Sequence, residues 1–223
     1  MRAPDAAGFV LAGGRSSRMG SDKALIELGG QPLVVHALEI LRAAGLHPSI
    51  AGARSALGAF SPVVDDAEAG LGPLGGICAA MASAQARWTV FVPVDLPLLP
   101  ASLVQHLLSE ARATGRAIAI PSVAGFSETF PAVLDRGVLP FLKSELEAGR
   151  GGCFSAFQAA AARLGQSVNV VAVEPLAEAG RVVHPDGLPA SSWFLNINSA
   201  EDLRRAEALL PDVRSRPRSH RVS

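Results

Sequence analysis

Short apolar runs alternate with longer amphipathic stretches along most of the chain. Residues 8–12 and 88–94 are almost uniformly apolar and rich in valine and phenylalanine, as is typical of strands that are buried on both faces. In residues 32–45 and 100–114, apolar positions recur at a spacing of three or four, which predicts helices. Strands that alternate with such helices predict an α/β fold with a mostly parallel sheet. We therefore expect a Rossmann-like, three-layer architecture.

Weaker patterns complete the expected order of elements. Ser199, with Asp202 three residues later, resembles a helix N-cap box before a last helix. No internal repeat or low-complexity linker interrupts residues 1–210, so we expect a single domain there, with residues 121–190 covering one end of a cleft. The further strands are expected at 48–52, 62–64, 117–120, 130–134, 168–173 and 193–198, and the further helices at 73–86, 137–148 and 152–164.

Composition places the chain among ordinary globular proteins. It has 223 residues, of which 49% are hydrophobic, and no apolar run is long enough to span a bilayer. The first residues lack the pattern of a signal peptide, so we expect a cytoplasmic protein. Cys78 and Cys153 have no metal-binding spacing and are expected to be reduced, packed thiols. The net charge is zero, and the arginines of residues 211–223 are interpreted as a disordered basic tail rather than as a nucleic-acid site.

The segment from Leu11 to Lys23 carries the first candidate chemistry. It follows a predicted strand and combines glycines, hydroxyl groups, two arginines and a lysine, a composition that favours the binding of phosphate. It contains neither a Walker A motif nor the Gly-x-Gly-x-x-Gly pattern of dinucleotide-binding folds. The chain has only two lysines, Lys23 and Lys143, which makes a lysine in this loop distinctive. An ordinary turn with solvated charges is the alternative.

Asp95 carries the second candidate chemistry because it directly follows the apolar run 88–94. Ligands of parallel sheets bind beyond the carboxyl ends of the strands, and Mg²⁺ takes one or two carboxylates together with phosphate oxygens. Asp95 is therefore a candidate Mg²⁺ ligand. A helix N-cap ahead of Pro97 and Pro100 is the alternative. The chain shows no Ser-His-Asp or Cys-His constellation, and its histidines lack the spacing of a zinc site.

Four motifs in order resemble those of the MobA-like nucleotidyltransferases, in particular the molybdenum cofactor guanylyltransferases. They are Leu-Ala-Gly-Gly-x-Ser-x-Arg-Met-Gly-x-Asp-Lys at 11–23, Asp66 followed by Gly-Pro-Leu-Gly-Gly at 72–76, Val-Pro-Val-Asp-Leu-Pro-Leu at 92–98, and Phe-Leu-Asn-Ile-Asn-Ser-Ala-Glu-Asp-Leu at 194–203. The resemblance implies a nucleotide-diphospho-sugar transferase type of fold. It also implies that the terminal phosphate of molybdopterin attacks the α-phosphorus of Mg²⁺-GTP and displaces pyrophosphate.

The resemblance also assigns roles to residues of this sequence. Lys23 is expected to contact the phosphates together with Arg18, and Arg15 is a weaker candidate. Asp95 is expected to hold the metal. Asp66 is expected to read the nucleotide, with the adjacent Asp65 as the alternative. The glycines of 72–76 either present a helix N-terminus to the ligand or serve close packing. The base and ribose are assigned to Leu11, Ala12, Gly13 and Gly14, and the acceptor to Asn196 and Asn198, which share one face of the strand expected at 193–198.

Several alternatives stay open. A molybdopterin cytidylyltransferase or a sugar-1-phosphate nucleotidyltransferase would use the same superfamily motifs, and a non-catalytic NTP-binding regulator would keep only the fold. Gly13-Gly14 favours guanine because cytidylyl relatives commonly have Ala-Gly at these positions. Residues 125–133 depart from the guanylyl pattern, so the acceptor is less well defined. The expected partners are GTP and molybdopterin, with transient contacts to proteins that deliver the cofactor or accept it, and without nucleic acid or membrane.

Overall fold

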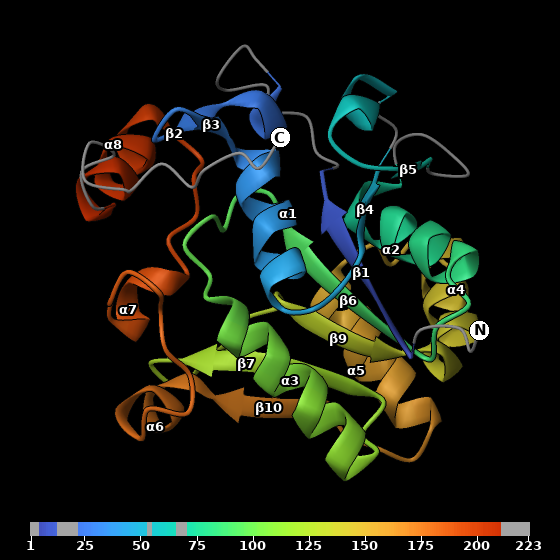
Figure 1. Ribbon diagram of the computed structural model, residues 1–223. Helices are drawn as coiled ribbons and strands as arrows, with labels where there is room; N and C mark the ends of the chain where they lie inside the picture. Colours follow the sequence, from blue (N-terminus) through green and yellow to red (C-terminus); the bar gives the residue numbers. More distant parts are fainter. Residues whose placement is uncertain (1–4, 13–21, 53–54, 66–70, 211–223) are drawn as a thin grey trace.

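The computed structural model describes residues 5–12, 22–52, 55–65 and 71–210, and its centre is a twisted sheet (Figure 1). The strands follow one another in the order β10-β7-β9-β6-β1-β4-β5, with β8 paired to β7. A separate two-stranded hairpin consists of β2 (Glu27–Leu28) and β3 (Gln31–Pro32). The strands of the main sheet are β1 (Ala6–Leu11), β4 (Pro48–Ala51), β5 (Val63–Val64), β6 (Trp88–Pro93), β7 (Ile118–Val123), β8 (Phe126–Ser127), β9 (Ala132–Asp135) and β10 (Asn169–Ala172).

Most strand pairs in this sheet are parallel. Strand β1 pairs in parallel with both β4 and β6, β4 pairs in parallel with β5, and β10 pairs in parallel with β7. Strand β9 lies antiparallel between β6 and β7, and β8 also pairs antiparallel with β7. The prediction of a mostly parallel, Rossmann-like sheet is confirmed. Since β9 is antiparallel to both of its neighbours, β6 and β7 run in the same direction and end at the same edge.

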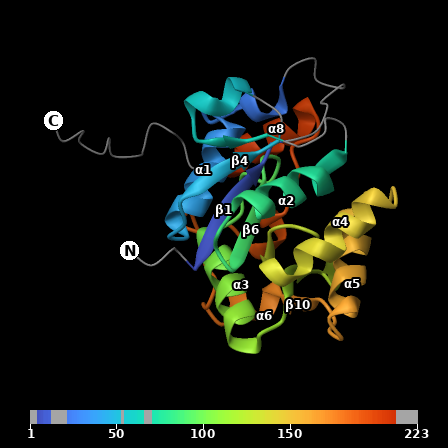
Figure 2. The ribbon, with the colours of Figure 1, turned by 90° about the vertical axis from the view of Figure 1, so that its right-hand side faces the viewer.

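Helices cover both faces of the sheet, which gives three layers (Figures 1 and 2). Helices α1 (Leu33–Ala43) and α3 (Ala101–Thr114) lie on one face. Helices α2 (Gly72–Ser83), α4 (Leu139–Glu147) and α5 (Cys153–Arg163) lie on the other. The remaining helices are α6 (Val173–Glu178), α7 (Ala190–Trp193) and α8 (Ala200–Leu209), with short 3₁₀ turns η1 (Lys23–Leu25), η2 (Ser55–Ala59) and η3 (Arg136–Val138).

Alternating side chains of the central strands enter two separate cores. Val10 packs with the α1 and α3 side, whereas its neighbour Phe9 packs with the α2 and α5 side. Val92 and Phe91 of β6 divide in the same way, and the rings of Phe9 and Phe91 stack with centroids 5.7 Å apart. Both runs are therefore buried on two faces, as their uniform apolar composition predicts.

Several local predictions are also confirmed. Helix α3 ends at Gly115, which adopts a left-handed conformation with φ of 65°. Ser199 is the N-cap of α8, and its hydroxyl oxygen accepts a hydrogen bond from the N–H of Asp202 at 3.1 Å. Cys78 and Cys153 are free thiols, and burial raises the pKa of each to about 11. Among the described residues, no helix is long and apolar enough to cross a membrane.

The strand predicted at 193–198 is wrong. Residues 190–193 form the short helix α7, and residues 194–198 follow without belonging to any strand. The buried residues Trp193 and Ile197 are four positions apart, and the segment makes one main-chain contact with the strand-end loop, from the N–H of Ile197 to the carbonyl of Asp95 at 2.9 Å. It therefore crosses the edge of the sheet instead of joining it. Asn196 and Asn198 are both exposed on either side of Ile197, although no strand arranges them.

Candidate active site

The carboxyl ends of β1, β4, β5 and β6 lie along one edge of the sheet (Figure 1). Main-chain hydrogen bonds extend this arrangement beyond the strands: Ala12 N–H donates to Ala51 at 3.1 Å, Gly52 N–H to Val64 at 3.2 Å, and Val94 N–H to Leu11 at 3.2 Å. These hydrogen bonds continue the parallel pairing of neighbouring strands by one residue at their carboxyl ends. This is the position at which α/β sheets bind their ligands.

Lys23 approaches this edge from the short turn η1. The Oδ1 atom of Asp22 accepts a hydrogen bond from Ala24 N–H at 3.1 Å and thereby caps the turn. Ala24 is fully buried among α1 and its neighbours, so the backbone beside Lys23 is held in place from both sides. The side chain of Lys23 is 19% exposed.

Asp95 lies two residues beyond β6, in a turn that leads to α3. The turn is closed by a contact from Leu96 N–H to the Pro93 carbonyl, and Leu96 is itself buried. The main-chain carbonyl of Asp95 accepts the bond from Ile197, and its side chain is 27% exposed. The alternative role as an N-cap is wrong, because Pro100 is the N-cap residue of α3.

Three side chains from distant parts of the sequence meet at this point. The Nζ atom of Lys23 lies 2.8 Å from Oδ2 of Asp95 and donates to Oδ1 of Asn198 at 2.6 Å. We refer to Lys23, Asp95 and Asn198 as the edge cluster. A partly exposed ion pair of this kind contributes at most about 1 kcal/mol to stability. The chemistry of the pair is more informative than its contribution to stability. The ammonium group would neutralise the negative charge of a phosphate chain, and the carboxylate beside it would hold a metal ion.

The edge cluster offers one carboxylate to a divalent metal ion that takes its other ligands from phosphate groups and water. Asp95 supplies one carboxylate, and Mg²⁺ sites that serve phosphate transfer take one or two carboxylates and fill the rest with phosphate oxygens and water. Across the described ranges, no group of three or more His, Cys, Asp or Glu side chains is placed to hold a metal ion.

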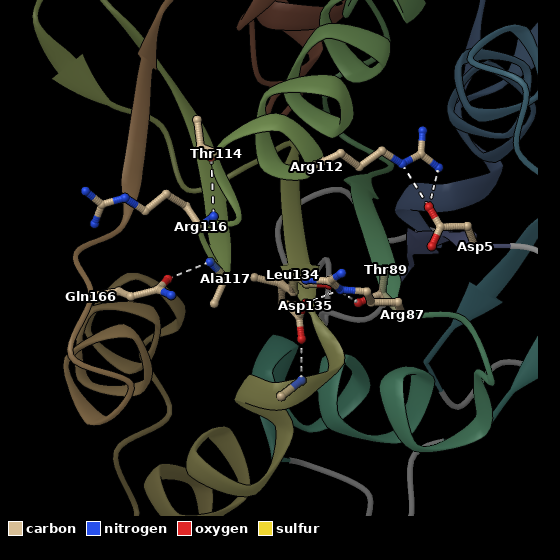
Figure 3. Close-up of polar contacts among 11 residues, drawn as sticks. Asp5, Arg87, Thr89, Arg112, Thr114, Arg116, Ala117, Leu134, Asp135 and Gln166 are labelled. Carbon is tan, nitrogen blue, oxygen red and sulfur yellow. Dashed lines mark hydrogen bonds and ion pairs between the residues drawn. The ribbon is translucent and has the colours of Figure 1, made fainter.

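The opposite edge of the sheet carries polar contacts of a different kind (Figure 3). Arg112 pairs with Asp5 at 2.9 Å, and Arg87 pairs with Asp135 at 2.8 Å. These are arginine–carboxylate pairs in which the arginines are largely exposed, and Asp135 also caps η3 through Gly137 N–H. We interpret this edge as structural.

The structure brings together part of the predicted site. Lys23, Asp95 and Asn198 converge, and Asn196 is exposed two residues before Asn198. The side chains of Leu11 and Ala12 are buried in the two cores, so the strand end offers mainly main-chain atoms to a ligand. Asp65 is exposed directly after β5. The predicted residues Gly13, Gly14, Arg15, Arg18 and Asp66, and the basic tail, lie outside the described residues.

Sequence reasoning missed two supporting carboxylates. Asp22 caps the turn that carries Lys23, and the signal was available because an Asp directly precedes the lysine. Asp202 was expected only as part of a cap box, but its Oδ2 atom also accepts from the N–H of Asn198 at 3.1 Å. The hydrogen bonds from Ser199 and from Asn198 lower the pKa of Asp202.

Comparisons with known proteins match most of the chain to one family. Residues 8–173 match the profile of the MobA-like NTP transferase domain. The molybdenum cofactor guanylyltransferase of Xanthomonas euvesicatoria pv. vesicatoria is 46% identical over 107 residues, which are 47% of this chain and 54% of that protein. The chain thus spans about half of that relative's length. The protein of the same name from Pseudomonas putida is 36% identical over 63% of this chain and 76% of its own length.

A solved structure shares the whole architecture. The molybdopterin-guanine dinucleotide biosynthesis protein A of Archaeoglobus fulgidus superposes with a TM-score of 0.72 over 91% of this chain and 97% of that one, at 22% sequence identity. At this identity the likeness shows the fold alone. The matched profile, together with the relatives, shows more: the chain belongs to the MobA-like NTP transferase family.

Proposed function

We propose that this protein transfers the GMP group of GTP to the terminal phosphate of molybdopterin and releases pyrophosphate. The observation that carries the proposal is the contact between Lys23 and Asp95 at the carboxyl edge of the parallel sheet. Two relatives that match this chain are named molybdenum cofactor guanylyltransferases, and this name supports the choice of base and acceptor.

The reaction needs charge neutralisation more than it needs a base. An oxygen of the acceptor phosphate forms a bond to the α-phosphorus, and the bond from that phosphorus to the oxygen bridging to the β-phosphate breaks, so that pyrophosphate leaves with the electron pair. A phosphate monoester is mostly dianionic at neutral pH, since its second pKa is about 6. The attacking group therefore arrives deprotonated, which explains why the motifs include no nucleophile or general base.

Lys23 and Asp95 divide the work of neutralisation. The ammonium group of Lys23 would leave its contact with Asp95 for the phosphates, while the amide oxygen of Asn198 keeps it at the site. Asp95 would then be free to hold Mg²⁺, which supplies positive charge to the phosphate oxygens in reactions of this type. Arg18 would add a second cation to the phosphate chain by resemblance to the family.

We assign the base and ribose to the strand-end segment. The side chains of Leu11 and Ala12 are buried, so their contribution would come from the main chain at the end of β1. By resemblance, Gly13 and Gly14 leave room for a purine, and Asp66 or its neighbour Asp65 reads the nucleotide. These assignments support GTP over CTP.

The acceptor would lie on the other half of the same edge. Ser122 pairs with β10 on one side and with β8 on the other, so β8 lies on the β9 side of β7, next to the end of β6. Phe126 of β8 is 75% exposed and could stack on a flat pterin ring. Asn196, which is exposed at this edge, supplies both a donor and an acceptor.

We place the reaction in the cytoplasm, where free thiols such as Cys78 and Cys153 persist. Because the product is a cofactor, we also propose transient contacts with the proteins that deliver molybdopterin or receive the dinucleotide.

Pyrophosphate release from each of the four NTPs, with and without molybdopterin, tests the proposal. We expect release only when GTP, molybdopterin and Mg²⁺ are all present. A preference for CTP would identify a cytidylyltransferase, and turnover with a sugar 1-phosphate in place of molybdopterin would identify the third alternative. Binding of an NTP without release under any of these conditions would indicate a regulator and would overturn the proposed activity.

A further inference from the structure

A continuous set of hydrogen bonds leads from the last helix to the edge cluster. Oδ2 of Asp202 accepts from the N–H of Asn198 at 3.1 Å and from the hydroxyl of Ser199 at 2.8 Å. Oδ1 of Asn198 then accepts from Lys23 Nζ at 2.6 Å, and Lys23 reaches Asp95 at 2.8 Å. A carboxylate in the first turn of α8 is thus connected to the cation of the site through one intervening residue.

Asn198 has little else to hold it. Its side chain is exposed, and residues 194–198 belong to no strand, so neither core packing nor a sheet ladder fixes its position. Two main-chain hydrogen bonds position the backbone at Asn198. The N–H of the buried neighbour Ile197 donates to the Asp95 carbonyl, and the N–H of Asn198 itself donates to Asp202. Removing the Asp202 carboxylate would leave the main-chain N–H of Asn198 without this acceptor. The side-chain amide of Asn198 would then be held less firmly against Lys23.

Asn198 and Asp202 lie after residue 173, where the match to the family profile ends. We propose that Asp202 is a positioning residue, whose carboxylate fixes Asn198 so that the amide oxygen holds the Lys23 ammonium group beside Asp95. The inference rests on the proposed function only for its catalytic consequence. The positioning itself can be measured without substrate.

The two lysines of the chain allow a direct test. Competitive labelling with acetic anhydride, followed by mass spectrometry, reports the reactivity of Lys23 relative to Lys143 in one molecule. Lys143 is exposed on α4, whereas Lys23 is 19% exposed and donates to two partners. We expect Asp202→Ala and Asn198→Ala each to raise the relative reactivity of Lys23, roughly three- to tenfold, since each removes a hydrogen bond to a charged group or its support.

Three controls separate positioning from general loosening of α8. Ser199→Ala removes the cap bond from Asp202 N–H and the hydroxyl bond to Asp202 Oδ2, but leaves the contact of Asp202 with Asn198. It should therefore lower thermal stability and leave Lys23 reactivity unchanged. Asp202→Asn keeps an amide oxygen as acceptor and should restore most of the protection. In an Asn198→Ala background, Asp202→Ala should add nothing. The inference is overturned if Ser199→Ala exposes Lys23 as strongly as Asp202→Ala does, or if the Asp202 and Asn198 effects are independent.

Measurements of nucleotide binding separate the positioning role of Asp202 from the proposed function of the protein. The affinity for Mg²⁺-GTP should fall roughly 10- to 100-fold in Asp202→Ala, the loss typical of removing a group that orients a site residue. If the wild-type chain binds no NTP, the proposed function fails while the labelling result stands. If the wild type binds GTP and Asp202→Ala binds it equally well, the positioning role is wrong.

Discussion

The choice of lysine at position 23 has a geometric reason. The chain uses lysine only at Lys23 and Lys143 and otherwise relies on arginine for positive charge. The Nζ atom serves two acceptors, on Asp95 and Asn198, at 2.8 and 2.6 Å. A compact ammonium group can rotate its three donors between such acceptors and an incoming phosphate, whereas a planar guanidinium prefers one bidentate partner. Lys23 can therefore keep its contacts with Asp95 and Asn198 in the resting site and still turn a donor toward a phosphate.

Asp95→Asn should abolish metal-dependent turnover while leaving the fold intact. The amide keeps the shape of the side chain but removes the charge that Mg²⁺ needs, so we expect kcat/KM to fall at least about 100-fold. The Asp95 side chain is 27% exposed and its main-chain carbonyl still accepts from Ile197, so thermal stability should change little. Steady-state kinetics and a melting curve measure the two effects.

Asp5→Asn is the matched control for this variant. Asp5 also pairs with a cation, Arg112, but at the opposite edge of the sheet (Figure 3). Its loss should leave the kinetics unchanged. Equal activity of Asp95→Asn and Asp5→Asn would show that the carboxylate of Asp95 has no role in turnover.

At the scale of elements, the sequence predicted best where composition alone determines burial. Strands β1 and β6 are apolar on both faces, so their runs are uniform and easily recognised. The β2–β3 hairpin was missed, although Gly29-Gly30 between two short segments is a signal for a two-residue turn, and both glycines have positive φ. The segment 193–198 was expected to be a strand in which Asn196 and Asn198 alternate with Ile197. The alternation instead reflects one anchor, Ile197, between two exposed asparagines.

The contacts of the edge cluster could likewise be predicted only in part from the sequence. Lys23 and Asp95 could be predicted because each follows a recognisable strand or loop motif. The contact between Lys23 and Asn198 joins residues 175 positions apart and depends on how the last segment crosses the sheet edge. No local pattern encodes that crossing.

Gly75→Ala should test the two interpretations of the glycines at the start of α2. A Cβ at Gly75 would lie 2.8 Å from the Cβ of Leu71, an atom that cannot move without the backbone. Overpacking costs about 1–3 kcal/mol, and the better helix propensity of alanine offsets up to about 1 kcal/mol of it. We therefore expect the free energy of unfolding, measured by urea denaturation, to fall by roughly 1–2 kcal/mol.

Gly58→Ala provides the control, since a Cβ there meets nothing within 4 Å. Its effect should stay within about 0.5 kcal/mol. A Gly75→Ala protein with wild-type stability but weakened GTP binding would refute the packing explanation and would indicate that the glycine lets a ligand approach the helix.

At the scale of the whole molecule, residues 173–210 return to the half of the chain that carries the site. Figure 1 shows α6, α7 and α8 along one side of the sheet, from β10 to the β2–β3 hairpin. The returning segment is fastened to the start of α3: Ser102 Oγ donates to the Val183 carbonyl at 2.7 Å and accepts from the Val183 N–H at 3.0 Å. Further on, Ile197 bonds to Asp95. The returning segment therefore also brings Asn198 to Lys23 at the site.

His184 follows Val183 directly in this returning segment. Its Nδ1 atom accepts from the N–H of Asp186 at 3.1 Å, and the ring also bonds to the main chain of Leu98. Accepting at Nδ1 requires the neutral ring with its proton on Nε2. Burial is the main cause that lowers the pKa of His184, ahead of the opposing effects of Asp186 and Leu98.

The wild-type protein should therefore lose stability when the pH falls below 6.5. Because the folded-state pKa lies below the unfolded value, the contribution of His184 is fully present above pH 6.5 and disappears as the pH falls through the folded-state pKa. We expect a loss of roughly 1 kcal/mol or less, since the ring is only half-buried. Urea denaturation at pH 7.5 and pH 5.5 measures it. His184→Gln should be less stable than wild type at pH 7.5 but lose less on acidification. An identical pH dependence in the two proteins would show that another group, and not His184, governs the loss of stability in acid.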